Sequence, residues 1–315
     1  MALRIVFCGT PAFAVPALRH LIAQPDFQVV GVVTQPDRPR GRGQETGASP
    51  VKDAAAEASV RVFQPVKIKS DEGYEYFTRL QPDAVVIIAY GQIISQRLID
   101  VPRLGWINVH ASLLPKYRGA APINWAIING EERTGLTTMR IDAGLDTGPM
   151  LLKYETAIAP DETAPELMAR LSQAGAPLIV ETLRGLESGA LAPSPQDNSR
   201  ATFAPPLKKE DGRIDWTRDA RQIHNRIRGL QPWPGAFTLF RGKNCHVWGA
   251  PVAVVQPSRG IATGTLTMAG SGLLVSCGDE TTLRLDFVQL EGRKRITARE
   301  FANGAHLAPG ESFGS

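Results

Sequence analysis

The first half of the chain alternates short apolar runs with helical patterns, and this alternation limits the fold more than any other feature. Five runs have the length of strands and are apolar on both faces: residues 3–8, 29–34, 60–63, 84–89 and 106–109. Helical patterns separate them near residues 12–23, 50–58, 71–80 and 92–99. Such strands, alternating with helices, are typical of a parallel sheet covered by helices. The sequence therefore predicts an α/β fold for this part.

The last of these runs contains Asn108 and is followed directly by His110. Residues two positions apart on a strand point to the same face, so the amide and the imidazole should lie side by side. Parallel sheets bind ligands at the carboxyl ends of their strands, where these two residues fall. An imidazole can move protons, and an amide can donate to an oxyanion. A single histidine beside an apolar run is also a common structural feature, so this pattern alone leaves both interpretations open.

An acidic loop with two glycines, Asp142–Gly148, follows further along the chain. Its Asp146 could bring a carboxylate to the imidazole of His110. Residues 137–141 and 150–154, on either side of the loop, have strand patterns, and residues 163–186 form a longer helical pattern that would close the domain. The turn after the first strand, Gly9-Thr10-Pro11, does not match G-x-G-x-x-G, so no dinucleotide site is predicted.

The rear of the chain has a different pattern. Residues 189–207 contain Gly189 and four prolines without a sustained period, which is typical of an extended linker. A helical pattern near residues 218–229 then precedes five short strand-like runs: residues 236–240, 245–253, 264–268, 273–276 and 282–289. This spacing predicts a small β-barrel such as an OB-fold. The predicted parts are a catalytic domain at 1–188, a linker at 189–207 and a barrel domain at 208–315.

Charge divides the chain at the same place. From Lys208 onward there are 15 Lys and Arg against 10 Asp and Glu, whereas the preceding residues have 20 against 21. A barrel with a basic surface is a common platform for tRNA or single strands. A solvated basic surface without a partner would have the same composition. The candidate contacts in this part are Lys208, Lys209, Arg213 and Arg226.

Composition limits the setting in which the protein works. No apolar run reaches about 18 residues, so no membrane-spanning segment is predicted. The N-terminus lacks the charged start and the long apolar stretch of a signal peptide. Three widely spaced cysteines, Cys8, Cys245 and Cys277, make neither a disulfide framework nor a metal site. We therefore expect a cytoplasmic protein with no metal and no membrane partner.

The residues around the strand end carry a resemblance to a known family. Asn108-x-His110 runs into Ser112-Leu113-Leu114-Pro115-x-Tyr117-Arg118-Gly119, and Gly144-Leu145-Asp146-Thr147-Gly148 follows downstream. This pattern resembles the signature of folate-dependent formyltransferases. The resemblance implies a Rossmann-like catalytic domain that takes a formyl group from 10-formyltetrahydrofolate. It also implies a catalytic set of Asn108, His110 and Asp146, and a folate site lined by the backbone of Ser112, Leu113, Leu114 and Pro115.

Residues 35–49 hold three arginines, Arg38, Arg40 and Arg42, among prolines and glycines. This composition predicts neither core nor a regular element. It fits a solvated loop, or a loop whose arginines reach phosphates. Its place and sequence are similar to the basic insertion of methionyl-tRNA formyltransferases, a branch of the same family. Relatives often carry lysines where this chain has Gln44-Glu45-Thr46, so we expect the loop to depend more heavily on Arg42.

The resemblance covers both predicted domains and implies formylation of the α-amine of methionyl-initiator-tRNA, which supplies N-formylmethionyl-tRNA for translation initiation. The expected partners are that tRNA and a tetrahydrofolate derivative, and we expect a monomer. Whether His110 acts mainly as acid or as base is left open by the sequence. Three alternatives stay open as well: a formyltransferase for a small amine, a hydrolase that releases formate, and a tRNA-binding protein whose transferase domain is inactive.

Overall fold

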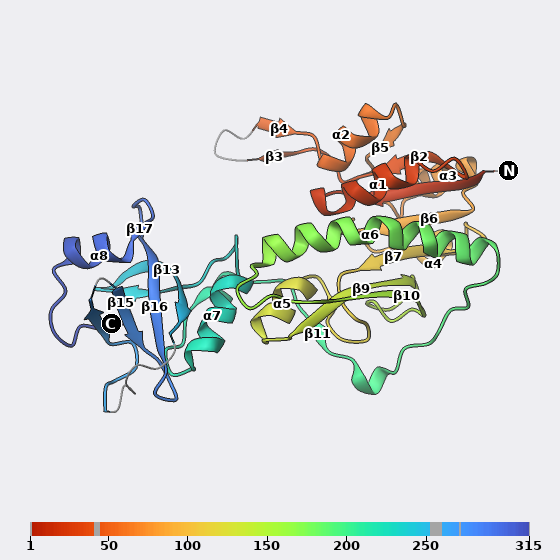
Figure 1. The fold of residues 1–315 in the computed structure, drawn as a ribbon. Helices are drawn as coiled ribbons and strands as arrows, with labels where there is room; N and C mark the ends of the chain where they lie inside the picture. Colours follow the sequence, from red (N-terminus) through yellow and green to blue (C-terminus); the bar gives the residue numbers. More distant parts are fainter. Residues whose placement is uncertain (1, 41–44, 253–259, 271, 315) are drawn as a thin grey trace. The chain divides into compact units, whose positions relative to one another are not determined.

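The structure is a computed structural model that describes residues 2–40, 45–252, 260–270 and 272–314 (Figure 1). Backbone contacts divide the chain into two units, which are described in turn. The first unit consists of Met1–Pro122, Arg133–Ala157 and Leu167–Pro205, and the second of Ile123–Glu132, Ile158–Glu166 and Pro206–Ser315. Within the described ranges, no helix is both long enough and apolar enough to cross a bilayer.

The first unit is built on a seven-stranded sheet with the order β10-β9-β7-β6-β1-β2-β5. Its strands are β1 (Leu3–Gly9), β2 (Phe27–Val33), β5 (Val62–Phe63), β6 (Ala84–Ile88), β7 (Trp106–His110), β9 (Arg133–Arg140) and β10 (Met150–Ala157). The first five pair in parallel, which confirms the predicted series of apolar strands. The other two add an antiparallel hairpin beside β7. All of β6 is buried, as expected for a strand covered on both faces.

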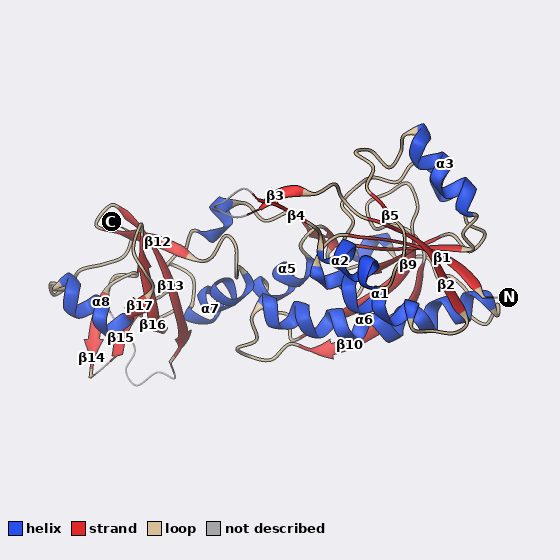
Figure 2. Cartoon of the chain, turned by 90° about the horizontal axis from the view of Figure 1, so that it is seen from above, coloured by secondary structure: helices blue, strands red, loops and turns tan. Residues whose placement is uncertain are grey.

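Helices cover both faces of this sheet. They are α1 (Val15–Ile22) with the short 3-10 helix η1 (Ala12–Ala14), α2 (Pro50–Glu57), α3 (Asp71–Leu80), α4 (Gln96–Ile99) and α6 (Ala164–Glu187). Figure 2 shows α3 on one side of the sheet and α1, α2 and α6 on the other. Serine side chains accept backbone N–H bonds at the starts of α2 and α3, which fixes where these helices begin.

Helix α4 is shorter than the predicted 92–99. The side chain of Gln92 accepts a hydrogen bond from the backbone nitrogen of Ile68 at 2.7 Å, and its amide reaches the carbonyl of Pro65. Ile94 packs into the apolar core. These contacts place residues 92–94 in a loop that is anchored to a distant segment, so the helix begins only at Gln96.

The stretch 35–49 contains a regular element, so the prediction that it has none is wrong. Strand β3 (Arg38–Arg40) pairs antiparallel with β4 (Glu45–Gly47), with Pro39 opposite Thr46. In a two-stranded ribbon each strand pairs along one edge only. A proline, which lacks the backbone N–H, is compatible with pairing where that N–H would point to the unpaired edge. Arg42 lies outside the described residues.

The second unit holds a six-stranded antiparallel sheet with the path β12-β13-β16-β15-β14, and β17 pairs with β16. Its elements are η3 (Lys209–Gly212), α7 (Ala220–Gly229), β12 (Phe237–Phe240), β13 (Lys243–Pro251), β14 (Leu266–Ala269), β15 (Gly272–Ser276), β16 (Thr282–Leu290), β17 (Ile296–Thr297) and α8 (Ala298–Ala305), and most of α5 (Pro122–Ile128) belongs to it. The five predicted strands and the helix before them are confirmed. Strand β17 and helix α8, which a Thr297–Glu300 capping box begins, were not predicted.

The C-terminal segment connects the two ends of this path. The backbone nitrogen of Leu266, on β14, donates to the carbonyl of Glu311 at 2.8 Å. The nitrogen of Gly314 donates to the carbonyl of Leu239, on β12, at 2.9 Å. Among the described residues, β12 and β14 do not pair directly, so the last residues complete the ring of strands. Ile223, Val247 and Leu283 pack inside, with the side chain of Ile223 supplied by α7.

Candidate active site

The site begins at the carboxyl end of β7, the strand between β6 and β9. Asn108 and His110 lie two residues apart on this strand, as predicted, and pair across to Met139 and Thr137 on β9. Asn108 is half-buried. Its side-chain amide has no hydrogen-bond partner within the part of the chain that the structure describes. The amide is therefore free to donate to a ligand.

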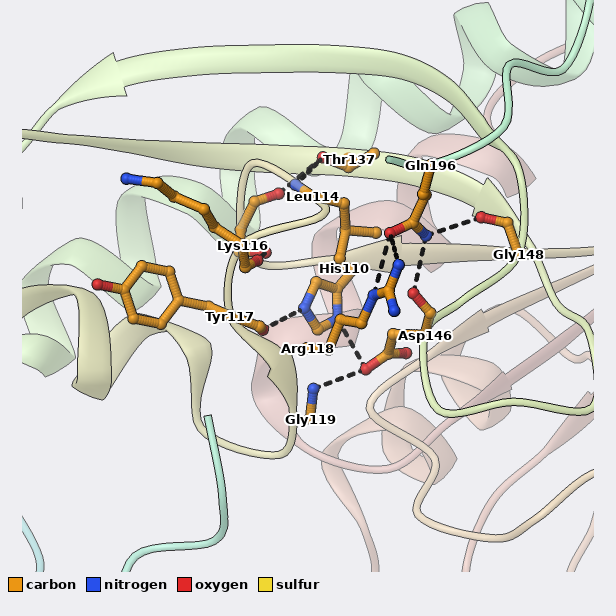
Figure 3. Close-up of polar contacts among 11 residues, drawn as sticks. His110, Leu114, Lys116, Tyr117, Arg118, Gly119, Thr137, Asp146, Gly148 and Gln196 are labelled. Carbon is orange, nitrogen blue, oxygen red and sulfur yellow. Dashed lines mark hydrogen bonds and ion pairs between the residues drawn. The ribbon is translucent and has the colours of Figure 1, made fainter. Parts of the chain in front are cut away.

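His110 is 6% exposed, and a polar group of the protein lies beside each of its ring nitrogens (Figure 3). Its Nε2 lies 2.9 Å from the backbone carbonyl of Tyr117. A carbonyl oxygen only accepts, so Nε2 carries the hydrogen. On the other side of the ring, Nδ1 lies 3.6 Å from Oδ2 of Asp146. The structure thus brings the predicted carboxylate to the predicted imidazole and fixes which nitrogen faces it.

Asp146 lies in the loop that joins β9 to β10. Its Oδ2 accepts a hydrogen bond from the backbone nitrogen of Gly119 at 2.8 Å. Within the loop, Oδ1 of Asp142 accepts from the nitrogen of Gly144 at 3.0 Å and from the hydroxyl of Thr147 at 2.7 Å. Asp146 itself has a φ of 51°, in the left-handed region that aspartate tolerates better than most residues. These bonds aim the carboxylate at His110.

The loop after β7, residues 112–115, is held by the protein itself. The hydroxyl of Thr137 donates to the carbonyl of Ser112 at 2.7 Å and accepts from the nitrogen of Leu114 at 3.1 Å. Lys153 Nζ donates to the carbonyl of Leu114 at 2.7 Å. The carbonyls of Leu113 and Pro115 also accept backbone bonds. The predicted folate contacts of this loop would therefore come from its shape and from the N–H groups of Ser112 and Leu113 more than from its carbonyls.

The segment 194–204 was predicted as an open linker, and its contacts with the site were missed. Strand β11 (Phe203–Ala204) pairs in parallel with β8 (Arg118–Gly119), which follows shortly after the loop of residues 112–115. The short 3-10 helix η2 (Asn198–Arg200) precedes it. Gln196 donates to the carbonyls of Asp146 and Gly148, both at 2.8 Å (Figure 3). Nothing in the local composition of this Pro-containing stretch signals these long-range bonds.

A cavity of about 560 Å³ opens at the carboxyl ends of β1, β2 and β6. These are the strands next along the sheet from β7, so the cavity and the His110 site share one edge. Gln35 lines the cavity, and its amide donates to the carbonyl of Tyr90 at 3.0 Å. The other lining residues are Thr10, Pro11, Pro36, Asp37, Gly47, Ser49, Ala89, Tyr90 and Gly91.

The predicted tRNA contacts are in different surroundings. Lys208, Lys209 and Arg213 are exposed, at or beside η3. Arg226 is half-buried and donates to the carbonyl of Asp211; burial lowers the pKa of its guanidinium. Arg38 and Arg40 lie on β3, and the placement of their side chains is not described. In the described ranges no group of three or more His, Cys, Asp or Glu side chains could hold a metal ion.

The chain is similar to known formyltransferases over nearly its whole length. A family model described as formyl transferase matches residues 3–183, and one described as formyl transferase, C-terminal domain, matches residues 206–306. Methionyl-tRNA formyltransferase of Solibacter usitatus is 56% identical over 313 residues, which cover 99% of each chain. The enzyme of the same name from Geobacter sulfurreducens is 50% identical over 312 residues, covering 99% of this chain and 97% of the relative.

Solved structures of other proteins share this fold. The N-formyltransferase from Helicobacter canadensis, in complex with folinic acid and dTDP-3-aminofucose, superposes with a TM-score of 0.67. The match covers 90% of this chain and 99% of that one, at 18% sequence identity. At this identity the likeness shows the fold of the chain and not its substrate.

Proposed function

The chain belongs to the methionyl-tRNA formyltransferase family, and we propose that it transfers the formyl group of 10-formyltetrahydrofolate to the α-amine of methionyl-initiator-tRNA. The family uses folate derivatives as formyl donors. The product would be N-formylmethionyl-tRNA for translation initiation. The observation that supports the chemistry best is the arrangement of Asn108, His110 and Asp146 at one edge of the sheet.

Formyl transfer needs a group that stabilises negative charge. An uncharged amine attacks the formyl carbon, which gives a tetrahedral intermediate with an oxyanion and a positively charged nitrogen. Free α-amines titrate at about 7.7–8.0, so an uncharged fraction is present near neutral pH. The unpartnered amide of Asn108 is suited to donate to the oxyanion. One such donor is typically worth about 3–4 kcal/mol in the transition state.

His110 is suited to act as the base. Since its Nε2 hydrogen is donated to Tyr117, the lone pair is on Nδ1, and Nδ1 takes the proton of the attacking amine beside the Asp146 carboxylate, which stabilises the positive charge. The imidazolium then donates to the Tyr117 carbonyl from one side and faces the Asp146 carboxylate from the other. As the bond between the formyl carbon and the folate nitrogen breaks, the same proton passes to that nitrogen.

The remaining substrate contacts are also proposals. The cavity at the carboxyl ends of β1, β2 and β6 has room for part of one substrate, at the same edge of the sheet as the reacting groups. We propose that the folate loop contributes Leu113 and Pro115, its half-buried members, to the donor site. Arginines 38, 40 and 42, with Lys208, Lys209, Arg213 and Arg226, would contact tRNA phosphates. We assign residues 1–188 to catalysis and 208–315 to tRNA binding, in a monomer that works in the cytoplasm.

The deciding assay offers one formyl donor to four acceptors. Labelled 10-formyltetrahydrofolate is incubated with the enzyme and either initiator methionyl-tRNA, elongator methionyl-tRNA, free methionine or buffer alone. Label on initiator methionyl-tRNA, with little on the others, is the expected result. Formate release without labelled tRNA would show a hydrolase instead. Labelled free methionine at a comparable rate would show that the tRNA body is not recognised.

A further inference from the structure

Gln196 uses both ends of its side-chain amide on the two loops that carry the catalytic groups, although it lies in the stretch between the two matched family domains. We infer that Gln196 is a positioning residue, which holds Asp146 against His110 without touching either substrate. This inference rests on the proposed function. Gln196 is not among the site residues that the sequence or the resemblance identified.

The nitrogen end of Gln196 fixes the acidic loop. Its Nε2 donates to the carbonyl of Asp146 and to the carbonyl of Gly148, each at 2.8 Å. Both hydrogens of the amide are used in this way. The two carbonyls lie on either side of Thr147, so the backbone that carries the Asp146 side chain is clamped at its own residue and two residues later (Figure 3).

The oxygen end of Gln196 fixes the other loop. Its Oε1 accepts from Arg118 Nε at 3.1 Å and from Arg118 Nη2 at 2.7 Å. Arg118 is 4% exposed and directly precedes Gly119, whose nitrogen donates to the Asp146 carboxylate. The bonds therefore form a closed circuit from the Asp146 backbone, through Gln196 and Arg118, back to the Asp146 side chain.

The segment that carries Gln196 is itself held on both sides. Met150 and Ser194 exchange two backbone hydrogen bonds of 2.8 Å. Further along, the carbonyl of Thr202 accepts from the nitrogen of Arg118 at 2.9 Å, and its hydroxyl accepts from the nitrogen of Tyr117 at 2.9 Å. The carbonyl of Tyr117 in turn holds the His110 ring. The backbone on both sides of Gln196 is thus fixed by hydrogen bonds, so the side chain of Gln196 can hold the two loops in place.

Its partners also determine which residue type can do this. A guanidinium only donates and a carbonyl only accepts, so the side chain needs an acceptor on one end and donors on the other. Glutamate would pair with Arg118 by charge-assisted bonds, but its second oxygen would face two carbonyl oxygens. Gln196→Glu therefore keeps the bond to Arg118 and breaks the clamp on the acidic loop, with almost no change in side-chain volume.

Asn198 supplies a matched control. Its Oδ1 accepts from Nη2 of the same arginine at 2.7 Å, and it makes no bond to the acidic loop within the described residues. Asn198→Asp introduces the same charge, next to the same guanidinium, and leaves the clamp intact. The two variants differ only in whether the carbonyls of Asp146 and Gly148 lose their donor.

The experiment compares wild type, Gln196→Glu and Asn198→Asp as full-length enzymes. It measures kcat and both KM values for formyl transfer, together with amide hydrogen exchange at Gly119. For Gln196→Glu we expect kcat to fall about 100-fold, as for a catalytic group displaced by about 1 Å, with both KM values little changed. Exchange at Gly119 should rise at least about tenfold, since its bond to a carboxylate is weakened. For Asn198→Asp each quantity should stay within about twofold of wild type.

Two results would overturn the inference. One is a Gln196→Glu enzyme with wild-type kcat and wild-type exchange at Gly119. The other is an equal loss in Asn198→Asp, which would place the effect on Arg118 and not on the acidic loop. If Gln196→Glu yields no folded protein, Gln196→Asn, which is one methylene shorter, replaces it with the same expectations. An inactive wild type would refute the proposed function, whereas the exchange comparison would still test the clamp.

Discussion

Gly119 gives the sharpest test of how the site is built. It has a φ of 117°, which side chains rarely adopt, and a Cβ placed on it would lie 2.7 Å from the carbonyl oxygen of Ala204 on β11. Its nitrogen is the donor that holds the Asp146 carboxylate. Gly119→Ala must therefore either push β11 away or move the donor away from Asp146.

The expected cost has two parts. Backbone strain of this kind costs about 1–3 kcal/mol. Losing a hydrogen bond to a charged acceptor costs about 1.5–3 kcal/mol. A combined loss of about 3 kcal/mol or more would lower the midpoint of thermal unfolding of this unit by about 6–12 °C. If the carboxylate moves by about 1 Å, turnover should also fall about 100-fold.

Gly189→Ala is the matched control, because it separates strain from collision. Gly189 has a φ of 72°, and nothing lies within 4 Å of a Cβ placed on it. It should cost only about 1–2 kcal/mol of left-handed strain and leave turnover unchanged. Thermal unfolding followed by circular dichroism, with the formyl-transfer rate, compares the two variants. A Gly119→Ala enzyme as stable and as active as Gly189→Ala would refute the reasoning about Ala204 and Asp146.

Three other predictions follow from the site and the two units. Asn108→Ala should lower kcat about 100- to 1000-fold with little change in KM, measured by single-turnover formyl transfer. A near-normal kcat would contradict the proposal that Asn108 stabilises the oxyanion. Arg42→Ala should raise the KM for tRNA far more than the dissociation constant for folate, and an equal effect on both would place this arginine in the folate site. The hydrogen bond from Arg241 lowers the pKa of Glu311 below its usual 4.5, so the stabilisation is present above about pH 4.5 and is lost as the pH falls through the folded-state value. Glu311→Gln should remove that acid-side loss from the pH profile of thermal unfolding, and an unchanged profile would contradict the assignment.

The strands and the positions of Asn108 and His110 on them could be predicted because their pattern is local. Buried parallel strands require apolar residues on both faces, and β1, β2, β6 and β7 show them in sequence. The period of two on a strand then sets Asn108 and His110 on one face. The loop pattern left the approach of Asp146 to His110 as one possibility and only the resemblance implied it, because no pattern within a loop fixes which distant strand end it meets.

The errors in the prediction have the same physical origin. Helix α4 is short because Gln92 bonds to Ile68, which is 24 residues away. The ribbon of β3 and β4 was missed because two edge strands tolerate the proline that argued against pairing. Closure of the second sheet by Glu311 and Gly314 depends on backbone groups, which carry no residue-type signal. In each case the deciding interaction joins residues that are far apart in the sequence, so no periodic pattern of residue types indicates it.

The polar residues of the site are positioned by two kinds of structure, a buried strand and a loop. Asn108 and His110 are positioned by a buried strand, whose register is set by apolar packing on both faces. Asp146 is positioned in a loop whose internal bonds, made by Asp142, are complemented by polar bonds from outside the loop. Those bonds come from Gly119 and from Gln196, and the second lies 50 residues further along the chain. The segment between the two matched domains therefore does more than join them, because it supplies bonds that hold the backbone of Asp146 from outside the loop.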